Sequence, residues 1–483
     1  MLGQVRRHPL MAIFVVALFL RLAFSFYFQQ FYFGHFIFKY SDTPGYLDPI
    51  LNLINHDTYM GDFYLEDSKY FRVPVYPGFL GIVHLVFGSD YFDYAVAFLQ
   101  SVIDAGSALL VYRILLLSTG SFRMAMLSGL LYASYPFIIL WTPISYTDIL
   151  QTFIVFVLLY TVLTGSRSKK SALLQGALVG VLVLTKQYLG LLVLVPLFMT
   201  LFSGKMKERV VEKVILIAMV FLGMGLALSP WVARNYVQSG KVIILKGEST
   251  GLRARGLDFE AFEKFANLFN ENITPMLYEI AYRGTATFNK HPAFVDRHRA
   301  EIDVAVKKAH ECGTSFMEIR MPTGYGPPHT GCNREVIQEF QALAKAFWEE
   351  VPLGEALETR ADAVKKIFLK SDVVSGKIAF SKAQLMKTAL FKYRVLLLLL
   401  GFAGIILVWM NYIAGAKQVF VLSVGLTAMA FYAFFALMIV HVEMRYILLP
   451  DLLVSIFASV PIVLLVERIM KRSRRPDAAG NIG

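Results

Sequence analysis

Charged residues are scarce in this 483-residue sequence, because Asp, Glu, Lys and Arg together make up only 17% of it. Hydrophobic residues make up 56%, and the mean hydropathy is +0.56. Water-soluble domains have about 25% charged residues, so this composition excludes a soluble enzyme of ordinary type. Apolar runs such as 9–28 and 395–410 approach or reach the roughly 20 residues that cross a bilayer. The sequence therefore predicts an all-α, polytopic membrane protein.

Several motifs of large enzyme classes are also missing. The sequence has no P-loop, no GxGxxG, no HExxH and no CxxC pair, so nucleotide hydrolysis, dinucleotide chemistry and a familiar zinc site have no support. It has no internal repeat of the kind that marks many secondary transporters. The net charge of +12 could indicate nucleic acid, but most of the excess cations border apolar segments. Membrane lipids explain this basic balance, and we expect no nucleic-acid partner.

Apolar windows predict about ten membrane-spanning helices. The predicted spans are 9–28, 92–117, 122–141, 147–164, 171–187, 188–203, 210–231, 394–412, 417–440 and 446–467. The apolar segment 75–88 has the length of an interfacial or re-entrant helix, so we count it as non-spanning. With that choice the basic loops all fall on one side, which the positive-inside rule assigns to the cytoplasm. The N-terminus, preceding a retained first span, and the C-terminus are then both cytoplasmic.

This topology divides the chain into four parts. Residues 1–231 form a transmembrane module whose first outer loop is 29–91, and residues 232–393 form an inserted extracytoplasmic domain. Residues 394–470 form the C-terminal transmembrane helices, and 471–483 a cytoplasmic tail. The insertion has apolar residues at helical spacing, which indicates a small folded helical domain. Its Cys312 and Cys332 are the only cysteines, and an oxidising exterior permits either a disulfide or two separate thiols.

Unusual charged residues near the predicted span ends all fall on the outer side. They are Asp42 in the first outer loop, Arg72, Asp148, Lys186, Arg234, and the group His441, Glu443 and Arg445. Cations at the hydrocarbon boundary are costly unless an anion or water meets them, so they indicate a functional cavity. A phosphate is the natural ligand of such a cavity. Carboxylates beside the cations could deprotonate a hydroxyl or hold a divalent metal, so a divalent metal is a possible cofactor and the metal requirement is unknown.

Most of these residues also have a purely structural interpretation. The four cations Arg72, Lys186, Arg234 and Arg445 could extend to the membrane surface without a ligand. Asp148 could complement the N-terminal end of its helix, and Asp104 could tie helices together within the bilayer. His441 could equally be structural. Asp42 has no such interpretation, because it lies in a loop with no helix end or nearby cation in the sequence.

Ordered blocks of sequence then suggest a family. The blocks are Ser41-Asp42 with Tyr46, Arg72-Val73-Pro74-Val75-Tyr76-Pro77, Phe87-Gly88, Tyr135-Pro136, Thr147-Asp148, Leu184-Thr185-Lys186, Pro230-Trp231, Arg234-Asn235-Tyr236, Glu443, Arg445-Tyr446 and Pro450. With these blocks the sequence resembles the GT-C fold integral-membrane glycosyltransferases, in particular bacterial relatives of protein O-mannosyltransferases and of the lipid A aminoarabinose transferase. The blocks occur in the expected order and on the expected side of the membrane.

The resemblance implies a site and a reaction. It implies that Asp42 is the catalytic base and that Asp148 matches a second carboxylate, usually Glu in these bacterial members. Arg72, Lys186, Arg234 and Arg445 would face the donor phosphate, while Tyr46, Tyr76, His441 and Glu443 are further site candidates. The implied reaction transfers a hexosyl or pentosyl group from a polyprenyl-phosphate donor to a hydroxyl of a glycan, lipid or protein acceptor, with inversion. The implied location is the outer face of a bacterial plasma (inner) membrane.

Two other functions stay open on the sequence alone. One is a transporter or flippase of an anionic lipid-linked sugar, which would usually have polar residues at mid-membrane and a repeated half. The other is a transferase like the O-antigen ligases or polymerases, which would lack the early Asp and the Arg-x-Pro block. The sequence leaves open the sugar, the acceptor, the oligomeric state and the role of the insertion.

Overall fold

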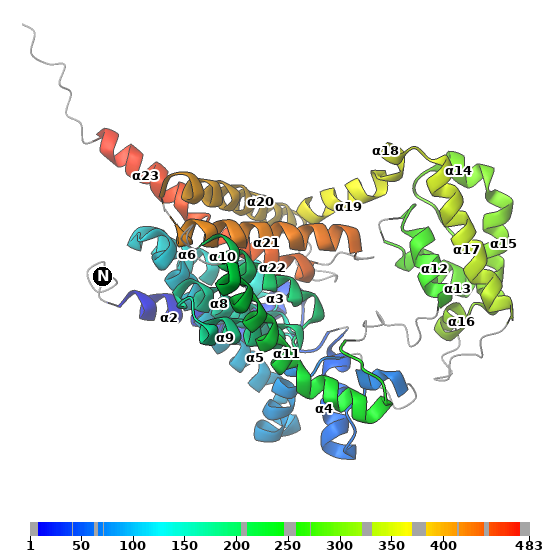
Figure 1. The fold of residues 1–483 in the computed structure, drawn as a ribbon, viewed down its shortest axis with the longest axis horizontal. Helices are drawn as coiled ribbons and strands as arrows, with labels where there is room; N and C mark the ends of the chain where they lie inside the picture. Colours follow the sequence, from blue (N-terminus) through cyan, green and yellow to red (C-terminus); the bar gives the residue numbers. More distant parts are fainter. Residues whose placement is uncertain are drawn as a thin grey trace, which may run out of the picture.

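The computed structural model is helical throughout the secondary structure that it describes (Figure 1). The described residues are 8–40, 42–61, 66–70, 72–203, 210–245, 257–270, 272–320, 331–369, 383–412, 415–438 and 444–473. The helices of the N-terminal part are α2 (Pro9–Ala23), η1 (Phe24–Phe28), α3 (Gln29–Phe33), α4 (Thr43–His56), η2 (Glu66–Tyr70), α5 (Val75–Thr119), α6 (Phe122–Ala133), α7 (Pro136–Ile139), α8 (Asp148–Thr164), α9 (Lys169–Val183), η3 (Gln187–Val193), α10 (Leu194–Phe202) and α11 (Val210–Ser239). The remaining helices are α12 (Leu257–Ala266), α13 (Thr274–Arg283), α14 (Pro292–Arg297), α15 (Arg299–Cys312), α16 (Thr314–Arg320), α17 (Gly331–Glu350), α18 (Leu353–Ala356), α19 (Glu358–Leu369), α20 (Ala383–Leu407), η4 (Val408–Tyr412), α21 (Ala416–Met438), α22 (Met444–Ser455) and α23 (Ser459–Ser473).

Within the described residues, six helical segments are long and apolar enough to cross a membrane. They are Pro9–Phe33, Val75–Thr119, Val210–Ser239, Thr388–Met410, Ala416–Ala436 and Met444–Lys471. Three further predicted spans coincide with shorter apolar helices, Phe122–Ala133, Asp148–Thr164 and Gln187–Phe202, and 171–187 coincides with α9. The prediction of an all-α, multi-pass membrane protein is confirmed, while the count of ten spans stays a prediction.

Helix α5 has a bend at Gly88 that divides it into two parts. Gly88 has φ 71° and ψ 174°, a conformation that is open to glycine because it lacks a Cβ atom. The part of α5 before this bend is shorter than the roughly 20 residues that a bilayer requires. The segment 75–88, which the sequence predicts to be non-spanning, therefore forms a separate helix that leads into the span.

Glycines allow α9 and α11 to pack backbone against backbone. A Cβ atom added at Gly176 would overlap the carbonyl of Val220, and one added at Gly223 would overlap the carbonyl of Leu173. Small residues at such contacts are typical of membrane helix pairs, because they let the two backbones approach closely. This pairing fixes the middle of α11 against α9.

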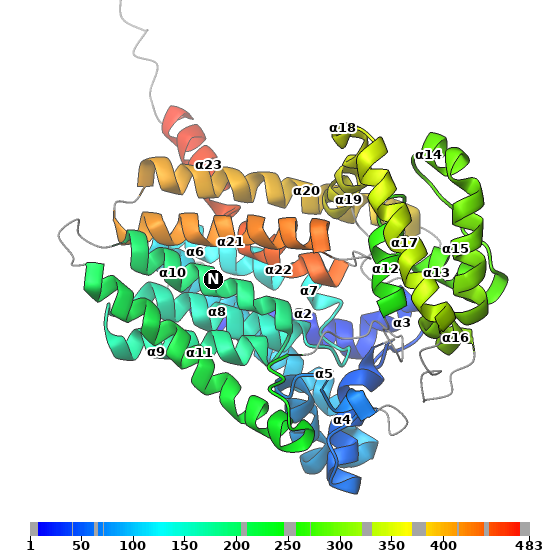
Figure 2. The same ribbon diagram turned by 45° about the vertical axis from the view of Figure 1, so that its right-hand side comes forward.

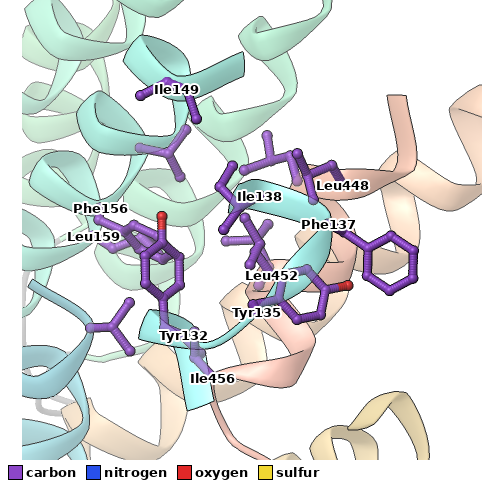
Figure 3. Packing of buried hydrophobic residues seen from close by; sticks show 14 of the residues in the cluster. Tyr132, Tyr135, Phe137, Ile138, Ile149, Phe156, Leu159, Leu448, Leu452 and Ile456 are labelled. Atoms are coloured by element: carbon purple, nitrogen blue, oxygen red, sulfur yellow. The ribbon is translucent and has the colours of Figure 1, made fainter. Parts of the chain in front are cut away.

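Aromatic and branched side chains fill the centre of the bundle. Figure 3 shows Tyr132 of α6 facing Phe156 of α8, with Leu448 and Leu452 of α22 on the other side of α7. The rings of Tyr132 and Phe156 meet edge to face, with their centroids 5.5 Å apart. Helix α22 thus packs on helices from the first third of the chain.

Two buried ion pairs tie helices together within the bundle. Arg21 of α2 donates to Asp104 of α5 at 2.5 Å, and Tyr132 donates to the same carboxylate. Arg394 of α20 donates to Asp451 of α22 at 2.5 Å, and all four charged side chains have an exposed fraction of 0%. Each charge faces an opposite charge and hydrogen-bonding groups, which is how buried ions are tolerated. Asp104 is thus a tie between helices.

Helices α12–α18 form a separate hydrophobic core. This core includes Phe262, Phe265, Phe269, Phe340 and Phe347, and it shares no member with the core of the bundle. The sulfur atoms of Cys312 and Cys332 are bonded, so α15 is covalently joined to α17. Below, we call α12–α18 the inserted domain; within the predicted insertion 232–393, α11 extends to Ser239 and α20 begins at Ala383.

The inserted domain lies beside one end of the bundle. In Figures 1 and 2 it stands apart from the bundle, near the end at which α21 finishes and α22 begins. In Figure 1, the start of α2 and the end of α23 lie at the opposite end. Helix α19 joins the two bodies, because it packs on α21 while Thr359 at its start donates to the carbonyl of Leu268 in the domain at 2.7 Å.

Candidate active site

The first outer loop meets α22 through an ion pair. Asp42 immediately precedes α4, and its Oδ2 accepts a hydrogen bond from Nη2 of Arg445, in the first turn of α22, at 2.6 Å. The backbone N–H of Asp42 donates to the hydroxyl of Tyr146 at 2.9 Å. Arg445 is 6% exposed and Asp42 is 34% exposed at the side chain, so the carboxylate keeps a face toward solvent. Two residues that are 403 positions apart therefore form one site.

The surrounding cations keep Asp42 ionised. Burial raises the pKa of this carboxyl, but the charge and hydrogen bond of Arg445 lower it, and the charges of Arg72 and Lys186 lower it further. The net result is a pKa below the ordinary value of 3.8. At neutral pH, Asp42 is a carboxylate that accepts hydrogen bonds.

Lys186 contributes a second buried cation. It precedes η3, and its Nζ lies 5.3 Å from the ring centroid of Tyr188 and 5.4 Å from that of Tyr446. Its Nζ is 3.9 Å from Oδ1 of Asp148, and it has no hydrogen-bond partner among the described residues. A buried ammonium normally has its hydrogen bonds satisfied, because desolvation is otherwise costly. This lysine is therefore poised for an anionic or polar ligand.

Asp148 lies behind Lys186. It is the first residue of α8, and it is 1% exposed. Nε2 of Gln151 donates to its Oδ1 at 3.3 Å, while its Oδ2 has no hydrogen-bond partner within the described part of the chain. The position of Asp148 in the first turn of α8 agrees with its structural interpretation, and its distance to Lys186 also makes it the counter-charge of that lysine.

Arg72 lies over the ring of Tyr46. The guanidinium carbon is 4.3 Å from the ring centroid, and a Cβ atom at Gly45 would come within 2.9 Å of Nη2 of Arg72. The absence of a side chain at Gly45 therefore lets the arginine approach α4. The ring of Tyr46 in turn meets that of Tyr76 edge to face, with their centroids 5.5 Å apart.

Tyr76 belongs to a buried polar layer below the site. Its hydroxyl donates to Oε1 of Gln100 at 3.0 Å, and Nε2 of Gln100 donates to the carbonyls of Thr142 and Ile144. These bonds fix the chain that leads to Tyr146 and α8. A search for charged residues does not identify Gln100. A polar side chain within a predicted membrane span is unusual, and this feature could have identified it.

Arg234 does not contact the other three cations or the described carboxylates of the site; it binds backbone carbonyls. Its guanidinium donates to the carbonyls of Lys69 at 2.7 Å and of Tyr59 at 2.8 Å. It also stacks near the rings of Tyr59, Tyr70 and Trp231. Because its donors bind the backbone of the first outer loop, Arg234 holds that loop on α11. Tyr59 continues the connection, since its hydroxyl donates to the carbonyl of Arg72 at 3.0 Å.

A cavity of about 470 Å³ joins the main site residues. It is lined by Asp42, Tyr46, Lys186, Gln187, Tyr188, Phe434, Arg445 and Tyr446. The lining combines one carboxylate, two cations and an aromatic wall that comes from η3, α21 and α22. This composition suits a ligand with an anionic group and an apolar or ring-shaped part.

The structure does not describe every predicted site residue, and the residues that it does describe form no metal site. His441 and Glu443 lie outside the described residues, as does Ser41 of the first sequence block. Among the described residues, no group of three or more His, Cys, Asp or Glu side chains could hold a metal ion. Asp42 faces Arg445, and Asp148 faces Lys186, so both carboxylates are matched with cations. The described donor set does not fit a divalent metal.

Comparison with known proteins connects part of the chain to a family. Residues 72–233 match the sequence model of a family described as "Dolichyl-phosphate-mannose-protein mannosyltransferase". This match bears out the predicted resemblance to membrane glycosyltransferases over those residues. Comparison with curated proteins gives no match.

Solved structures of low sequence identity are also similar. The apo oligosaccharyltransferase of Archaeoglobus fulgidus is 13% identical, with a TM-score of 0.49, and the match covers 98% of this chain and 53% of that one. ArnT from Cupriavidus metallidurans bound to undecaprenyl phosphate is 13% identical, with a TM-score of 0.38 and coverage of 98% and 81%. ArnT in the apo state is 16% identical, with a TM-score of 0.36 and coverage of 95% and 78%. The chain thus spans about half the length of the archaeal enzyme.

Proposed function

We propose that this protein is a membrane glycosyltransferase that moves one sugar from a polyprenyl-phosphate donor to an acceptor hydroxyl. The observation that carries the proposal is the cavity in which the carboxylate of Asp42 meets the cations of Lys186 and Arg445. The family match over residues 72–233 supports the same reaction class. A soluble donor would not need this site to sit at the end of a membrane bundle.

The two cations of the cavity would bind the donor phosphate. Arg445 offers several N–H donors in a planar fork, and the ammonium of Lys186 lacks a hydrogen-bond partner among the described residues. The aromatic wall of Tyr188, Phe434 and Tyr446 would lie against the sugar or the first isoprene unit. The rest of the polyprenyl chain would extend into the lipid beside the bundle.

Asp42 would act as the general base. The acceptor oxygen attacks the anomeric carbon of the sugar, and the bond between that carbon and the phosphate oxygen breaks. The proton of the acceptor hydroxyl passes to Asp42, and the bonding pair stays on the departing polyprenyl phosphate. Arg445 and Lys186 stabilise the negative charge that develops on this leaving group. A single displacement of this kind inverts the anomeric configuration.

The other predicted site residues support these three. Asp148 would hold Lys186 in place, and Arg72 would add positive charge next to Asp42 from its position over Tyr46. Arg234 would act through the first outer loop and not on the phosphate. Because the described carboxylates do not fit a metal, no step of this reaction is assigned to one.

The cellular setting is part of the proposal. The protein would lie in a bacterial plasma membrane, with both termini in the cytoplasm and the cavity and inserted domain on the outer face. The sidedness is supported by the basic loops of the sequence and by the disulfide of the inserted domain, which requires an oxidising compartment. The acceptor would be a glycan, lipid or protein that reaches the cavity from the side of the inserted domain.

The proposal is tested with purified protein in detergent, labelled polyprenyl-phosphate sugars and a membrane acceptor extract. Wild type should consume at least one pentosyl or hexosyl donor. Asp42→Asn should still bind that donor but transfer about 10²- to 10⁴-fold more slowly, which is the usual contribution of a general base. Asp48→Asn is the matched control, because Asp48 lies in α4 outside the cavity lining, and it should keep wild-type activity.

Two results would contradict the proposal. Normal transfer by Asp42→Asn would remove Asp42 as the base, and Asp148 would become the next candidate. Failure of the wild type to consume any donor, together with movement of labelled lipid across proteoliposomes, would favour a transporter.

A further inference from the structure

The ion pair between Asp42 and Arg445 forms part of the cavity wall. The two side chains come from the first outer loop and from α22, and both belong to the cavity lining. Nη2 of Arg445 donates to Oδ2 of Asp42 at 2.6 Å and lies 3.3 Å from the hydroxyl of Tyr446. The guanidinium is held between two rings, with its carbon 4.9 Å from the centroid of Tyr146 and 5.1 Å from that of Tyr446. The arginine is thus fixed in a position where it faces the carboxylate.

This arrangement conflicts with the roles that the reaction needs. Arg445 binds only Oδ2 of Asp42, but its positive charge makes the whole carboxylate a poor proton acceptor, whereas a base must accept a proton readily. The donor phosphate needs the same guanidinium. Two anions therefore compete for one cation in a single cavity.

We propose that the donor phosphate displaces Asp42 from Arg445, and that this exchange releases Asp42 to accept the proton of the acceptor hydroxyl. The inference rests on the proposed function, because it assumes a phosphate ligand in this cavity. It adds that Arg445 holds Asp42 until the donor is bound.

Charge around the cavity supports such an exchange. The described charged groups there are the cations Arg72, Lys186 and Arg445 and the carboxylates Asp42 and Asp148. A polyprenyl-phosphate sugar is a phosphodiester, and its negative charge is attracted by these cations. Lys186 has no hydrogen-bond partner among the described residues, so the phosphate can bind it before the ion pair between Arg445 and Asp42 breaks.

The same exchange runs backward after the reaction. When Asp42 takes the proton it becomes neutral, and the departing polyprenyl phosphate gains the corresponding negative charge. Arg445 then faces the more highly charged phosphate. Loss of the proton from Asp42 to water restores a competitor for Arg445, which favours release of the lipid product.

A double-mutant cycle tests the exchange with undecaprenyl phosphate as the probe. The dissociation constant is measured in detergent for wild type, Asp42→Asn, Arg445→Gln and the double variant. If Asp42 competes with the phosphate, Asp42→Asn should bind the probe about 10-fold more tightly than wild type. In the Arg445→Gln background, removal of the Asp42 charge should improve binding much less, because the guanidinium for which the two anions compete is gone.

Controls separate competition from general charge and folding effects. Asp48→Asn removes a carboxylate from α4 outside the cavity lining and should leave binding unchanged. Each variant is checked for monodisperse elution and a cooperative melting transition, and Asp42→Ala replaces Asp42→Asn if the latter does not fold. Equal or weaker binding by the charge-removed variant would overturn the exchange, as would the same gain in affinity with and without Arg445.

Failure of the inference can be told from failure of the proposed function. If wild type binds undecaprenyl phosphate and transfers sugar, but removal of Asp42 gives no tighter binding, only the exchange is wrong. If wild type neither binds undecaprenyl phosphate nor transfers sugar, the proposed function is wrong and the exchange falls with it.

Discussion

Buried charges in this protein fall into two groups at the scale of single residues. Arg21 with Asp104 and Arg394 with Asp451 are close pairs, with additional hydrogen bonds from Tyr132 and Tyr432. Lys186 is less closely matched, since its Nζ lies 3.9 Å from Asp148 and lacks a hydrogen-bond partner among the described residues. Nη2 of Arg21 also lacks one, but Nε of Arg21 is bound to Asp104 at 2.5 Å. Groups left unsatisfied at a cavity are typical of sites whose partner is a ligand.

Substitution of Lys186 tests this difference. We expect Lys186→Gln to weaken undecaprenyl phosphate binding by about 10- to 150-fold, because a hydrogen bond to a charged group contributes about 1.5–3 kcal/mol. Lys186→Arg keeps the charge and should lose less. The measurement is a binding isotherm in detergent, and unchanged affinity in Lys186→Gln would show that the lysine serves only as the counter-charge of Asp148.

The depressed pKa of Asp42 gives stability a dependence on pH. A carboxyl whose pKa is lower in the folded than in the unfolded state contributes stability that is complete above the unfolded pKa and is lost as pH falls through the folded pKa. The ordinary value for Asp42 is 3.8 and its folded value lies below that. The difference in melting temperature between wild type and Asp42→Asn should therefore be constant above about pH 5 and shrink below about pH 4. A difference that changes between about pH 6 and 8 would point to a histidine instead.

The sequence predicted which charged residues lie on one side but not all of their contacts. Asp42, Arg72, Lys186 and Arg445 converge as expected, because membrane topology alone restricts where they can meet. Arg234 obeys the same topology, yet its side chain binds the backbone of the first outer loop. Topology fixes the end of the bundle at which a residue lies, whereas the direction of its side chain depends on loop packing that no sequence pattern encodes.

At the scale of elements, the contact between α4 and α5 positions the proposed base. Asp42 directly precedes α4, and α4 packs on the first part of α5. A Cβ atom at Gly81 would overlap Cγ1 of Ile50, which lies on α4. The two helices can therefore approach this closely only because position 81 has no side chain.

Gly81→Ala should push α4 away from α5 and move Asp42. We expect a loss of about 1–3 kcal/mol in the free energy of unfolding, as is usual for overpacking, together with slower transfer. Gly78→Ala is the matched control, because a Cβ atom there meets nothing within 4 Å. That control should be neutral or slightly stabilising, since alanine is favoured over glycine inside a helix. Equal melting temperatures and equal rates for the two variants would contradict this role of the helix contact.

The sequence predicted the boundaries of the helices only in part. The sequence predicted a break after the apolar segment 75–88, where the structure has a bend at Gly88, while its non-spanning position stays a prediction. The extension of α11 to Ser239 was not predicted, because its last turns are polar and carry no hydropathy signal. The sequence also did not predict that α19 packs on α21, because an amphipathic pattern indicates which face of a helix is buried but not which element covers it.

At the scale of the whole molecule, the bundle and the inserted domain have separate cores. The disulfide lies entirely within the inserted domain, and α19 connects that domain to α21. The cavity lining includes Arg445 and Tyr446 at the start of α22, and Figure 2 shows the inserted domain near that end of the bundle. This arrangement supports a role of the domain in bringing an acceptor to the cavity.

The separate cores predict two thermal transitions. Reduction of the bridge between Cys312 and Cys332 should destabilise the inserted domain by about 3 kcal/mol, the usual effect of closing a loop of this length, and leave the transition of the bundle unchanged. Scanning calorimetry with and without reductant measures both transitions. The double variant Cys312→Ser with Cys332→Ser should match the reduced wild type, and a shift of both transitions by equal amounts would show that the two bodies unfold as one.

The most direct test of the whole account is a single-turnover reaction with the donor that wild type consumes. The products are separated, the released lipid is quantified, and the anomeric configuration of the transferred sugar is determined by NMR. We expect one polyprenyl phosphate released for each sugar transferred, an inverted anomeric centre, and product formation by donor-bound Asp42→Asn that is about 10²- to 10⁴-fold slower than by wild type. A retained configuration, or equal product from Asp42→Asn, would contradict a single displacement in which Asp42 is the base.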